Sequence, residues 1–267
     1  MASAAAIREH YDSFAPIYRV FWGDHIHHGL FTRGNESPAE AQVALLEHCV
    51  RAINLKRGAR VLDVGCGHGG TCIHLAKEYG CRATGITLSS RQAQIAREQA
   101  SANGVAGKVD FQVADADHYD FPSGSYDVVW AMESSEHFAD KAGYFRRAAA
   151  SLRKNKDSKL LLAAWTGSME DSSVRQVSEK FLCASLITAS EYARQMEDAG
   201  LRIVSREDLT AKVQRTWEIC RQRARMATPM LYLLPDGVKD FVRGIDVILE
   251  AYGSGALSYT VIAAEKG

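Results

Sequence analysis

Short apolar runs recur through the middle of the chain, and most of them are followed by segments with apolar residues at helical spacing. The runs predict buried strands at residues 60–64, 81–86, 109–114, 126–132 and 159–165. Two later β-prone segments, 201–209 and 256–264, bring the expected sheet to seven strands. Because strands that alternate with helices form a mostly parallel sheet with helices on both faces, the pattern predicts an α/β fold.

Capping signals indicate where several helices begin and end. The sequence Ser37-Pro-Ala-Glu40 is typical of a capping box with proline at the first helical position, so a helix is expected from residue 38. Asp140 is expected to cap a later helix that ends at Arg153-Lys154. Asn103-Gly104 should end the helix expected at 90–102.

The composition excludes several classes of partner. Lys and Arg together number 32, as do Asp and Glu, so the chain lacks the positive charge that nucleic acid binding requires. No run approaches the roughly eighteen apolar residues of a membrane span, and no secretion signal is recognisable, so we expect a cytoplasmic protein. Six cysteines without C-x-x-C spacing favour buried thiols over a zinc site. The sequence leaves open whether the chain forms a homo-oligomer.

A glycine-rich loop follows the first expected strand, with the sequence Asp63-Val-Gly65-Cys-Gly67-His-Gly69. Ligands of open α/β sheets bind at this edge, and glycines let the backbone approach them closely. A dinucleotide site should carry an acidic residue about twenty residues further on, but the second strand ends at Thr87. Asp63 itself suits a ligand with an ammonium group and a sulfonium. A glycine turn without a ligand is the alternative.

These residues resemble motif I of class I methyltransferases that use S-adenosylmethionine (AdoMet). The segment 85–92 resembles the subgroup of cyclopropane fatty acid synthases and tocopherol methyltransferases, in which Thr and Gln replace the acidic ribose ligand. The resemblance implies a Rossmann-like fold, AdoMet as cofactor, and Asp115 near the adenine amino group; Asp115 could instead be a turn or cap residue. The cofactor-binding residues expected from the resemblance are Tyr11, Asp63, Gly65, Gly67, Thr87, Leu88, Gln92, Asp115, Ala116 and Met132.

An N-terminal motif, Trp22-Gly-Asp24-His25-Ile-His27-His28-Gly29, has three interpretations. A metal site would need ligand partners that the spacing does not provide, and a purely structural segment is the second alternative. We favour an acceptor pocket in which His25 or His28 accepts a proton, and we expect no metal. The motif resembles the N-terminal segment of plant tocopherol and alkaloid methyltransferases, and the resemblance implies that Tyr11 reaches the cofactor carboxylate.

A second polar motif, Met132-Glu133-Ser-Ser-Glu136-His137, follows the fourth strand and resembles the same relatives. We expect Glu133 to lie nearest the transferred methyl group, and Glu136 or His137 to orient the acceptor. A solvated turn that begins a helix is the alternative. The expected catalytic residues are therefore His25, His28, Glu133, Glu136 and His137.

The expected organisation has four regions. Residues 1–56 form a helical segment that closes the cofactor site, 57–166 the Rossmann-like AdoMet-binding core, 167–236 a mainly helical substrate cap with one returning strand, and 237–267 the last helix and strand. Substrate choice is expected to involve Trp165, Trp217 and the stretch 226–234, although methionines and aromatics at such spacing are more often plain core residues. The basic run Arg221–Arg225 is expected to be a solvated helix face, with an anion clamp as the alternative.

The expected reaction is in-line methyl transfer from AdoMet to a carbon or nitrogen of a small aromatic, indole-like or isoprenoid metabolite. Lipid chemistry of the cyclopropane synthase kind is the main alternative, and a non-catalytic AdoMet-binding protein is another. A hydride-transferring dehydrogenase is the last alternative, which tight NAD binding would favour.

Overall fold

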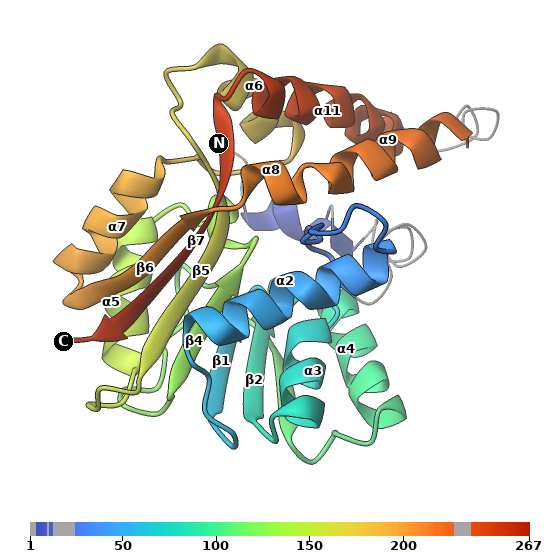
Figure 1. Cartoon of the computed structure of the whole chain (residues 1–267). Helices are drawn as coiled ribbons and strands as arrows, with labels where there is room; N and C mark the ends of the chain where they lie inside the picture. The colour runs from blue at the N-terminus through green and yellow to red at the C-terminus, as the bar shows by residue number, and fades with distance from the viewer. Residues whose placement is uncertain (1–3, 10, 13–24, 227–235) are drawn as a thin grey trace.

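The computed structural model describes residues 4–9, 11–12, 25–226 and 236–267. One seven-stranded sheet, with the order β3-β2-β1-β4-β5-β7-β6, forms its centre (Figure 1). Strand β7 runs antiparallel to β5 and β6, and the other six strands all run in one direction. The predicted mostly parallel, seven-stranded sheet is confirmed. The strands are β1 (Arg60–Val64), β2 (Arg82–Thr87), β3 (Val109–Val113), β4 (Val128–Met132), β5 (Lys159–Gly167), β6 (Leu201–Asp208) and β7 (Leu257–Lys266).

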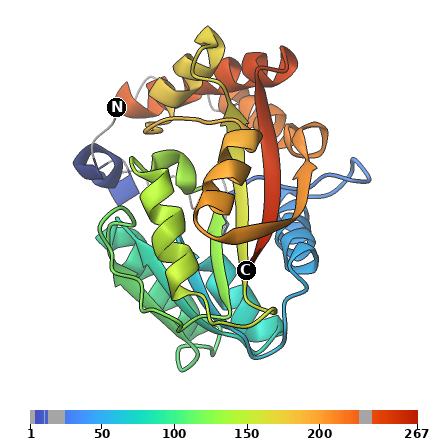
Figure 2. The ribbon, with the colours of Figure 1, turned by 90° about the vertical axis from the view of Figure 1, so that its left-hand side faces the viewer.

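Helices cover both faces of the sheet, as the strand and helix pattern predicts (Figures 1 and 2). One apolar layer joins alternate strand residues to α2, α3 and α4, and a second layer joins the intervening residues to α5 and α7. The described helices are α2 (Pro38–Ala52), α3 (Gly70–Glu78), α4 (Ser90–Ala102), α5 (Lys141–Ser151), α6 (Ser172–Lys180), α7 (Ala189–Asp198), α8 (Thr210–Val213), α9 (Arg215–Met226), α11 (Asp236–Gly253) and the 3-10 turn η1 (Ser135–His137). Residues 4–9 and 11–12 are also helical.

The predicted helix starts are confirmed by their capping bonds. The Ser37 hydroxyl accepts from the Glu40 backbone N–H while the Glu40 carboxylate accepts from the Ser37 backbone N–H, which completes the capping box of α2. Asp140 caps α5 by accepting from the Gly143 N–H at 2.8 Å. Such caps satisfy helix N–H groups that have no partner within the helix.

Two element ends differ from the expectation. Helix α5 ends at Ser151 rather than at Arg153-Lys154, because Leu152 is extended and buried in the core. Arg153 instead forms an ion pair with Asp127 at 2.9 Å. Strand β5 continues to Gly167, since β7 pairs with it up to the contact between Gly167 and Leu257. Long-range packing sets both ends.

The helices of residues 167–236 lie in two places. Helix α7 packs on β6 and α5, on one face of the sheet. Helices α6 and α9 both pack against α11, and Figure 1 shows these three above the end of the sheet. In the described part of the chain, no helix combines the length and the apolar content needed to cross a bilayer.

Two glycines allow a matched test of how tightly the loop after β1 is packed. Gly69 and Gly58 both have positive φ, 80° and 76°. A Cβ at Gly69 would lie 2.7 Å from the Phe111 ring and 2.9 Å from Ala96, whereas a Cβ at Gly58 has no neighbour within 4 Å.

We therefore expect Gly58→Ala to lower the free energy of unfolding by about 1–2 kcal/mol, the cost of the left-handed backbone alone. Gly69→Ala should cost about 1–3 kcal/mol more, because overpacking adds to that strain. Urea denaturation of both variants measures the difference. Equal losses would contradict the crowding at Gly69.

Candidate active site

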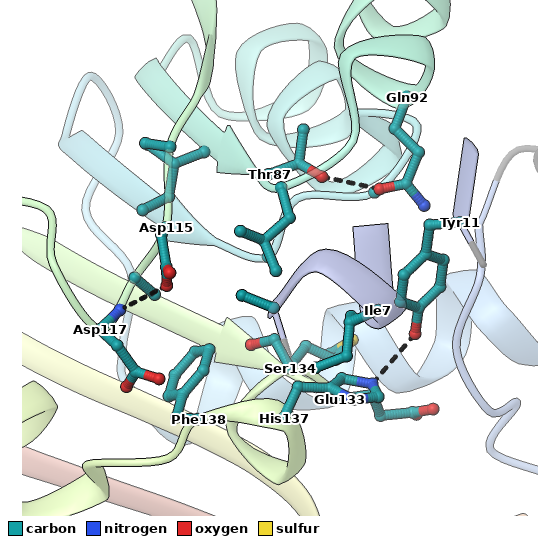
Figure 3. A pocket seen from close by; sticks show the side chains of 18 of the residues that line it. Ile7, Tyr11, Thr87, Gln92, Asp115, Asp117, Glu133, Ser134, His137 and Phe138 are labelled. Atoms are coloured by element: carbon teal, nitrogen blue, oxygen red, sulfur yellow. Dashed lines mark hydrogen bonds between the residues drawn. The ribbon is translucent and has the colours of Figure 1, made fainter. Parts of the chain in front are cut away.

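A pocket opens at the carboxyl ends of β1, β2, β3 and β4, where side chains from the loops after all four strands meet (Figure 3). The helical N-terminal residues also contribute to it. Asp12 accepts hydrogen bonds from the Ser89 hydroxyl and the Arg91 N–H at the start of α4, which holds this segment beside the pocket. Its lining includes Ala4, Ile7, Tyr11, Ile26, Gly65, Gly67, Thr87, Leu88, Gln92, Asp115, Ala116, Met132, Glu133, Ser134, His137 and Phe138.

One wall of this pocket carries neutral polar groups. The Thr87 hydroxyl donates to the Gln92 side-chain oxygen at 2.7 Å, which fixes the orientation of the Gln92 amide (Figure 3). Asp115 accepts from the Asp117 backbone N–H at 3.0 Å and so forms the turn after β3. Asp115 therefore forms this turn and also lines the pocket.

The loop after β1 approaches the loop after β4 too closely for any residue but glycine at Gly65. A Cβ there would lie 2.2 Å from that of Ser134, and φ is 84°. The Ser134 hydroxyl donates to the Val64 carbonyl at 2.6 Å, which ties the ends of β1 and β4 together. The pocket is thus bounded by two loops in direct contact.

Asp63 lies below the glycine-rich loop and lines a smaller pocket beside the first one. The residue is 3% exposed, and its carboxylate accepts a hydrogen bond from the Cys72 thiol at 3.3 Å. Burial raises the pKa of Asp63 to about 7. The two pockets share Ile26, Gly65, Gly67 and Met132, so Asp63 is near the larger pocket without lining it.

His25 and His27 line the same small pocket as Asp63. His27 Nδ1 donates to the His28 carbonyl at 2.8 Å, because a carbonyl can only accept. Burial lowers the pKa of His27, so its Nε2 carries a lone pair, and that buried atom has no partner among the described residues. Burial also lowers the pKa of His25 to about 3. Both imidazoles are neutral.

A further pocket joins the first at Tyr11, Ile26, Glu133 and His137. Strand β5 contributes Trp165, η1 contributes Glu136, and the helices above the sheet contribute Trp217 and Phe241. The full lining is Tyr11, Ile26, His28, Glu133, Glu136, His137, Trp165, Phe181, Thr216, Trp217 and Phe241. The walls are largely aromatic, and two carboxyl groups and two imidazoles are set among them.

Glu133 stands where the two larger pockets meet, and three hydrogen bonds hold its carboxylate. One oxygen accepts from the His28 N–H and the Tyr259 hydroxyl, each at 2.8 Å, and the other accepts from His28 Nδ1 at 2.9 Å. Burial favours the protonated form, but the contacts with His28 outweigh it and the pKa of Glu133 lies below its usual value. Glu133 is therefore an anion at neutral pH.

Both ring nitrogens of His28 are occupied inside the protein. The Trp217 indole N–H donates to His28 Nε2 at 2.7 Å, and Tyr252 lies 3.3 Å from the same nitrogen. Because an indole N–H can only donate, His28 Nε2 is unprotonated. His28 Nδ1 therefore carries the proton and donates the hydrogen bond to Glu133. His28 thus orients Glu133 and has no nitrogen left to take a proton from an acceptor.

Glu136 and His137 lie next to each other in η1 and differ in their contacts. One Glu136 oxygen accepts from the Trp165 backbone N–H at 2.8 Å, and burial raises the pKa of the Glu136 side chain to about 7. His137 Nδ1 donates to the Leu182 carbonyl at 3.0 Å, and its Nε2 is hydrogen-bonded to the Tyr11 hydroxyl at 3.0 Å (Figure 3). Leu182 has a positive φ of 55°, which presents this carbonyl.

The structure brings most of the expected site residues together. Of the expected cofactor-binding residues, all but Asp63 line the larger pocket, and Asp63 lies in the small pocket beside it. Of the expected catalytic residues, His28, Glu133, Glu136 and His137 line the aromatic pocket. His25 lies apart from them, at the glycine-rich loop.

Some lining residues have no signal in the sequence. Phe181 and Phe241 occur in no spacing that distinguishes them from core residues, whereas Trp165 and Trp217 stand out as large aromatics outside the motifs. His27 lies within the N-terminal motif, but its position in the motif does not indicate a role. Trp22 and Asp24 of the N-terminal motif, and all of the stretch 226–234 except Met226, lie outside the described residues. Among the described residues, no group of three or more His, Cys, Asp or Glu could hold a metal ion.

Comparison with known proteins identifies the family. The model of the family described as mycolic acid cyclopropane synthetase matches residues 1–231. The chloroplastic tocopherol O-methyltransferase of Arabidopsis thaliana is 28% identical over an alignment of 289 positions, which covers 97% of this chain and 81% of that protein. The 27-O-demethylrifamycin SV methyltransferase of Amycolatopsis mediterranei is 32% identical over 218 residues, 80% of this chain and 79% of that protein.

A solved structure has the same fold. Geranyl diphosphate C-methyltransferase from Streptomyces coelicolor, in complex with Mg²⁺, geranyl diphosphate and S-adenosyl-L-homocysteine, superposes with a TM-score of 0.81 at 22% identity. The superposition covers 99% of this chain and 97% of that one. The expected family, enzyme class and cofactor are confirmed. The chain is an AdoMet-dependent methyltransferase of small molecules and belongs to the mycolic acid cyclopropane synthetase family.

Proposed function

We propose that the chain transfers the methyl group of AdoMet to a carbon or nitrogen of a small aromatic, indole-like or isoprenoid metabolite. The observation that carries this proposal is the junction of two pockets at Tyr11, Glu133 and His137. One pocket has the glycine-rich loop and the polar wall that suit AdoMet. The other is aromatic and of a different chemical character, as an acceptor site for such metabolites should be.

The cofactor is proposed to extend along the larger pocket. Thr87 and Gln92 present neutral hydrogen-bonding groups to the ribose hydroxyls, and Asp115 and Ala116 lie where the adenine ring would bind. Leu88 and Met132 supply apolar contacts, and Gly65 and Gly67 allow the backbone to approach. The methionine end would then face the small pocket of Asp63 and His27.

The acidic and neutral groups of that small pocket suit the amino acid end of the cofactor. The unpaired Nε2 of His27 is a hydrogen-bond acceptor in a buried site, and an unmet acceptor costs free energy until a donor arrives. The ammonium group of the cofactor is such a donor, and Asp63 supplies the matching charge once it is ionised. We therefore add His27 to the proposed cofactor-binding residues, and give His25 no role toward the acceptor.

The acceptor is proposed to lie between β5 and the helices above the sheet. Trp165, Phe181, Trp217 and Phe241 offer flat apolar surfaces, which suit an aromatic or isoprenoid group. No Lys or Arg is found among the described lining residues. The basic run Arg221–Arg225 therefore does not line this pocket. A diphosphate acceptor, such as the geranyl diphosphate bound by the Streptomyces enzyme, would therefore lack cationic partners in this part of the pocket.

The reaction is proposed to be an in-line displacement. AdoMet supplies an activated methyl group on a sulfonium, so the chain's own residues have to orient and enclose the reactants. Orientation can contribute roughly 7–11 kcal/mol in favourable cases. Tyr11 and His137 are hydrogen-bonded to each other at the junction, and Glu136 lines the acceptor pocket, where it can hold or accept a proton.

The four-region organisation is likewise proposed from these contacts. The segment before residue 57 places Ile7, Tyr11 and Ile26 over the cofactor pocket. Helices α9 and α11, with Phe181 after α6, form the acceptor cap.

The proposed function predicts methyl transfer from labelled AdoMet to at least one member of a panel of indoles, amines, quinols, prenyl compounds and unsaturated lipids. Label should enter a carbon or nitrogen position, and label on oxygen alone would contradict the proposal. Mass spectrometry of the products identifies the methylated atom. Label that enters unsaturated lipids only would support the cyclopropane synthase alternative, and tight cofactor binding with no product from any acceptor would contradict the proposal.

Asp63→Asn should have opposite effects on stability and on cofactor binding. The raised pKa means that the folded chain keeps a proton that the unfolded chain loses, so Asp63 destabilises the fold as pH rises from about 4 to about 7. The asparagine variant lacks this penalty, which corresponds to at most about 4 kcal/mol. Urea denaturation should therefore show the variant gaining stability over the wild type between pH 5 and pH 8.

The same variant should bind S-adenosylhomocysteine at least about tenfold more weakly at pH 8, since it loses one charged partner of the ammonium group. Calorimetry measures this affinity. Wild-type affinity should also fall as pH drops below about 7, when Asp63 becomes protonated. Unchanged affinity in the variant would remove Asp63 from the cofactor site.

His27→Asn tests the amino acid end separately. An asparagine amide can still donate to the His28 carbonyl in place of Nδ1, but it provides no acceptor at the position of Nε2. S-adenosylhomocysteine should bind about tenfold more weakly, while 5′-methylthioadenosine, which lacks the amino acid, should bind as before. His48→Asn, at a partly exposed histidine paired with Glu207, is the control. An equal loss for both ligands would indicate a structural role for His27.

A further inference from the structure

The electrostatic character of the acceptor pocket narrows the class of acceptor. Glu133 is a fixed anion at the junction of the pockets, because His28 and Tyr259 give it three hydrogen bonds and its partner imidazole is held in one tautomer. Its side chain is 12% exposed, so water screens its charge little. A charge that develops in the acceptor within this pocket will interact with it strongly.

The aromatic walls favour the same sign of charge. Trp165, Phe181, Trp217 and Phe241 form a continuous set of edge-to-face or tilted contacts, with ring centroids 5.1–6.2 Å apart. The faces of such rings attract cations, and most strongly where water is excluded. Together with the lack of Lys and Arg among the described lining residues, these walls make the pocket suited to a cation and unsuited to an anion.

A second carboxyl group adds a hydrogen-bonding preference. One oxygen of Glu136 accepts a hydrogen bond from the Trp165 backbone N–H. The other oxygen lies 3.5 Å from the Ser135 hydroxyl, which is the limit of a hydrogen bond. This second oxygen can accept from an N–H group of a ligand. A hydrocarbon acceptor would leave this oxygen without a partner.

We infer that the acceptor is an amine whose nitrogen becomes a methylated ammonium ion held between Glu133 and the aromatic walls. This inference rests on the proposed function and selects nitrogen among its acceptor atoms. A phenolate or another anionic acceptor is disfavoured, because it would be repelled by Glu133.

The charge balance of the reaction agrees with this choice. An acceptor that arrives as an ammonium ion first gives a proton to the Glu136 carboxylate and becomes a neutral amine. The nitrogen lone pair then forms the N–C bond as the S–C bond breaks, and the electron pair of that bond goes to sulfur. The sulfonium becomes a neutral thioether while the nitrogen becomes positive. One positive charge is present before and after, so the attraction of Glu133 is kept throughout the transfer.

A matched pair of probes tests the inference without knowledge of the natural acceptor. Trimethylphenylammonium and tert-butylbenzene have almost the same shape and differ by one positive charge. With the enzyme saturated in S-adenosylhomocysteine, the cation should bind about tenfold more tightly or better, an effect of the anion and the aromatic rings together. Quenching of tryptophan fluorescence, or calorimetry, measures both affinities. Equal affinities, or no binding of the cation at millimolar concentration, would overturn the inference.

Two variants locate the source of the preference. Glu133→Gln keeps the shape of the side chain and removes the charge, so it should abolish most of the preference for the cation and leave the affinity for tert-butylbenzene unchanged. Glu207→Gln, at a surface carboxylate paired with His48, should keep the full preference. A Glu133→Gln variant that folds, as judged by circular dichroism, and retains the preference would contradict the role of Glu133. If that variant does not fold, the comparison of the two probes in the wild type still decides the inference.

Labelled methyl transfer separates this inference from the proposed function. Label in amines supports both. Label only in the carbon of an indole, quinol or prenyl compound would overturn the amine inference and leave the proposed function in place. The absence of product from every acceptor class would overturn the proposed function itself.

Discussion

The buried carboxylate of Glu133 is the constraint around which the site is organised. It sits at a left-handed turn directly after β4, with φ of 50°, and its oxygens accept from His28 and from Tyr259 of β7. Burying an unpaired carboxylate would be very costly, so these donors have to be present for the chain to fold in this way. The hydrogen bonds therefore link the N-terminal motif, the centre of the sheet and its antiparallel strand.

The same network extends to helices α9 and α11 above the sheet. His28 accepts a hydrogen bond from Trp217 of α9 and lies beside Tyr252 of α11. The orientation and tautomer of its imidazole therefore depend on two helices above the sheet. Those helices also supply walls of the aromatic pocket. The geometry that holds the Glu133 carboxylate therefore depends on the position of these two helices, because His28 contacts both of them and Glu133.

The two larger pockets have different structural origins. The pocket that contains Thr87 and Gln92 is built from loops at the ends of adjacent parallel strands, an arrangement that the order of strands dictates. The aromatic pocket is assembled from β5, η1, α9 and α11, which are distant in sequence. Its polar groups are nevertheless ordered by local means: Leu182 is held at positive φ to orient His137, and the Trp165 backbone orients Glu136.

The sequence by itself determined the sheet, most helix ends and the cofactor loop, because periodicity, capping residues and glycines act over short distances. It also placed Asp63, Thr87, Gln92, Glu133 and Glu136 in motifs whose position after a strand implies a shared edge. Only the tertiary structure decided that His28 orients Glu133, that His25 and His27 lie at the glycine-rich loop, and that Phe181 and Phe241 complete the aromatic pocket. These placements depend on contacts between separate elements of the fold, and His28 is more than 100 positions from both Glu133 and Trp217, so no local pattern encodes them.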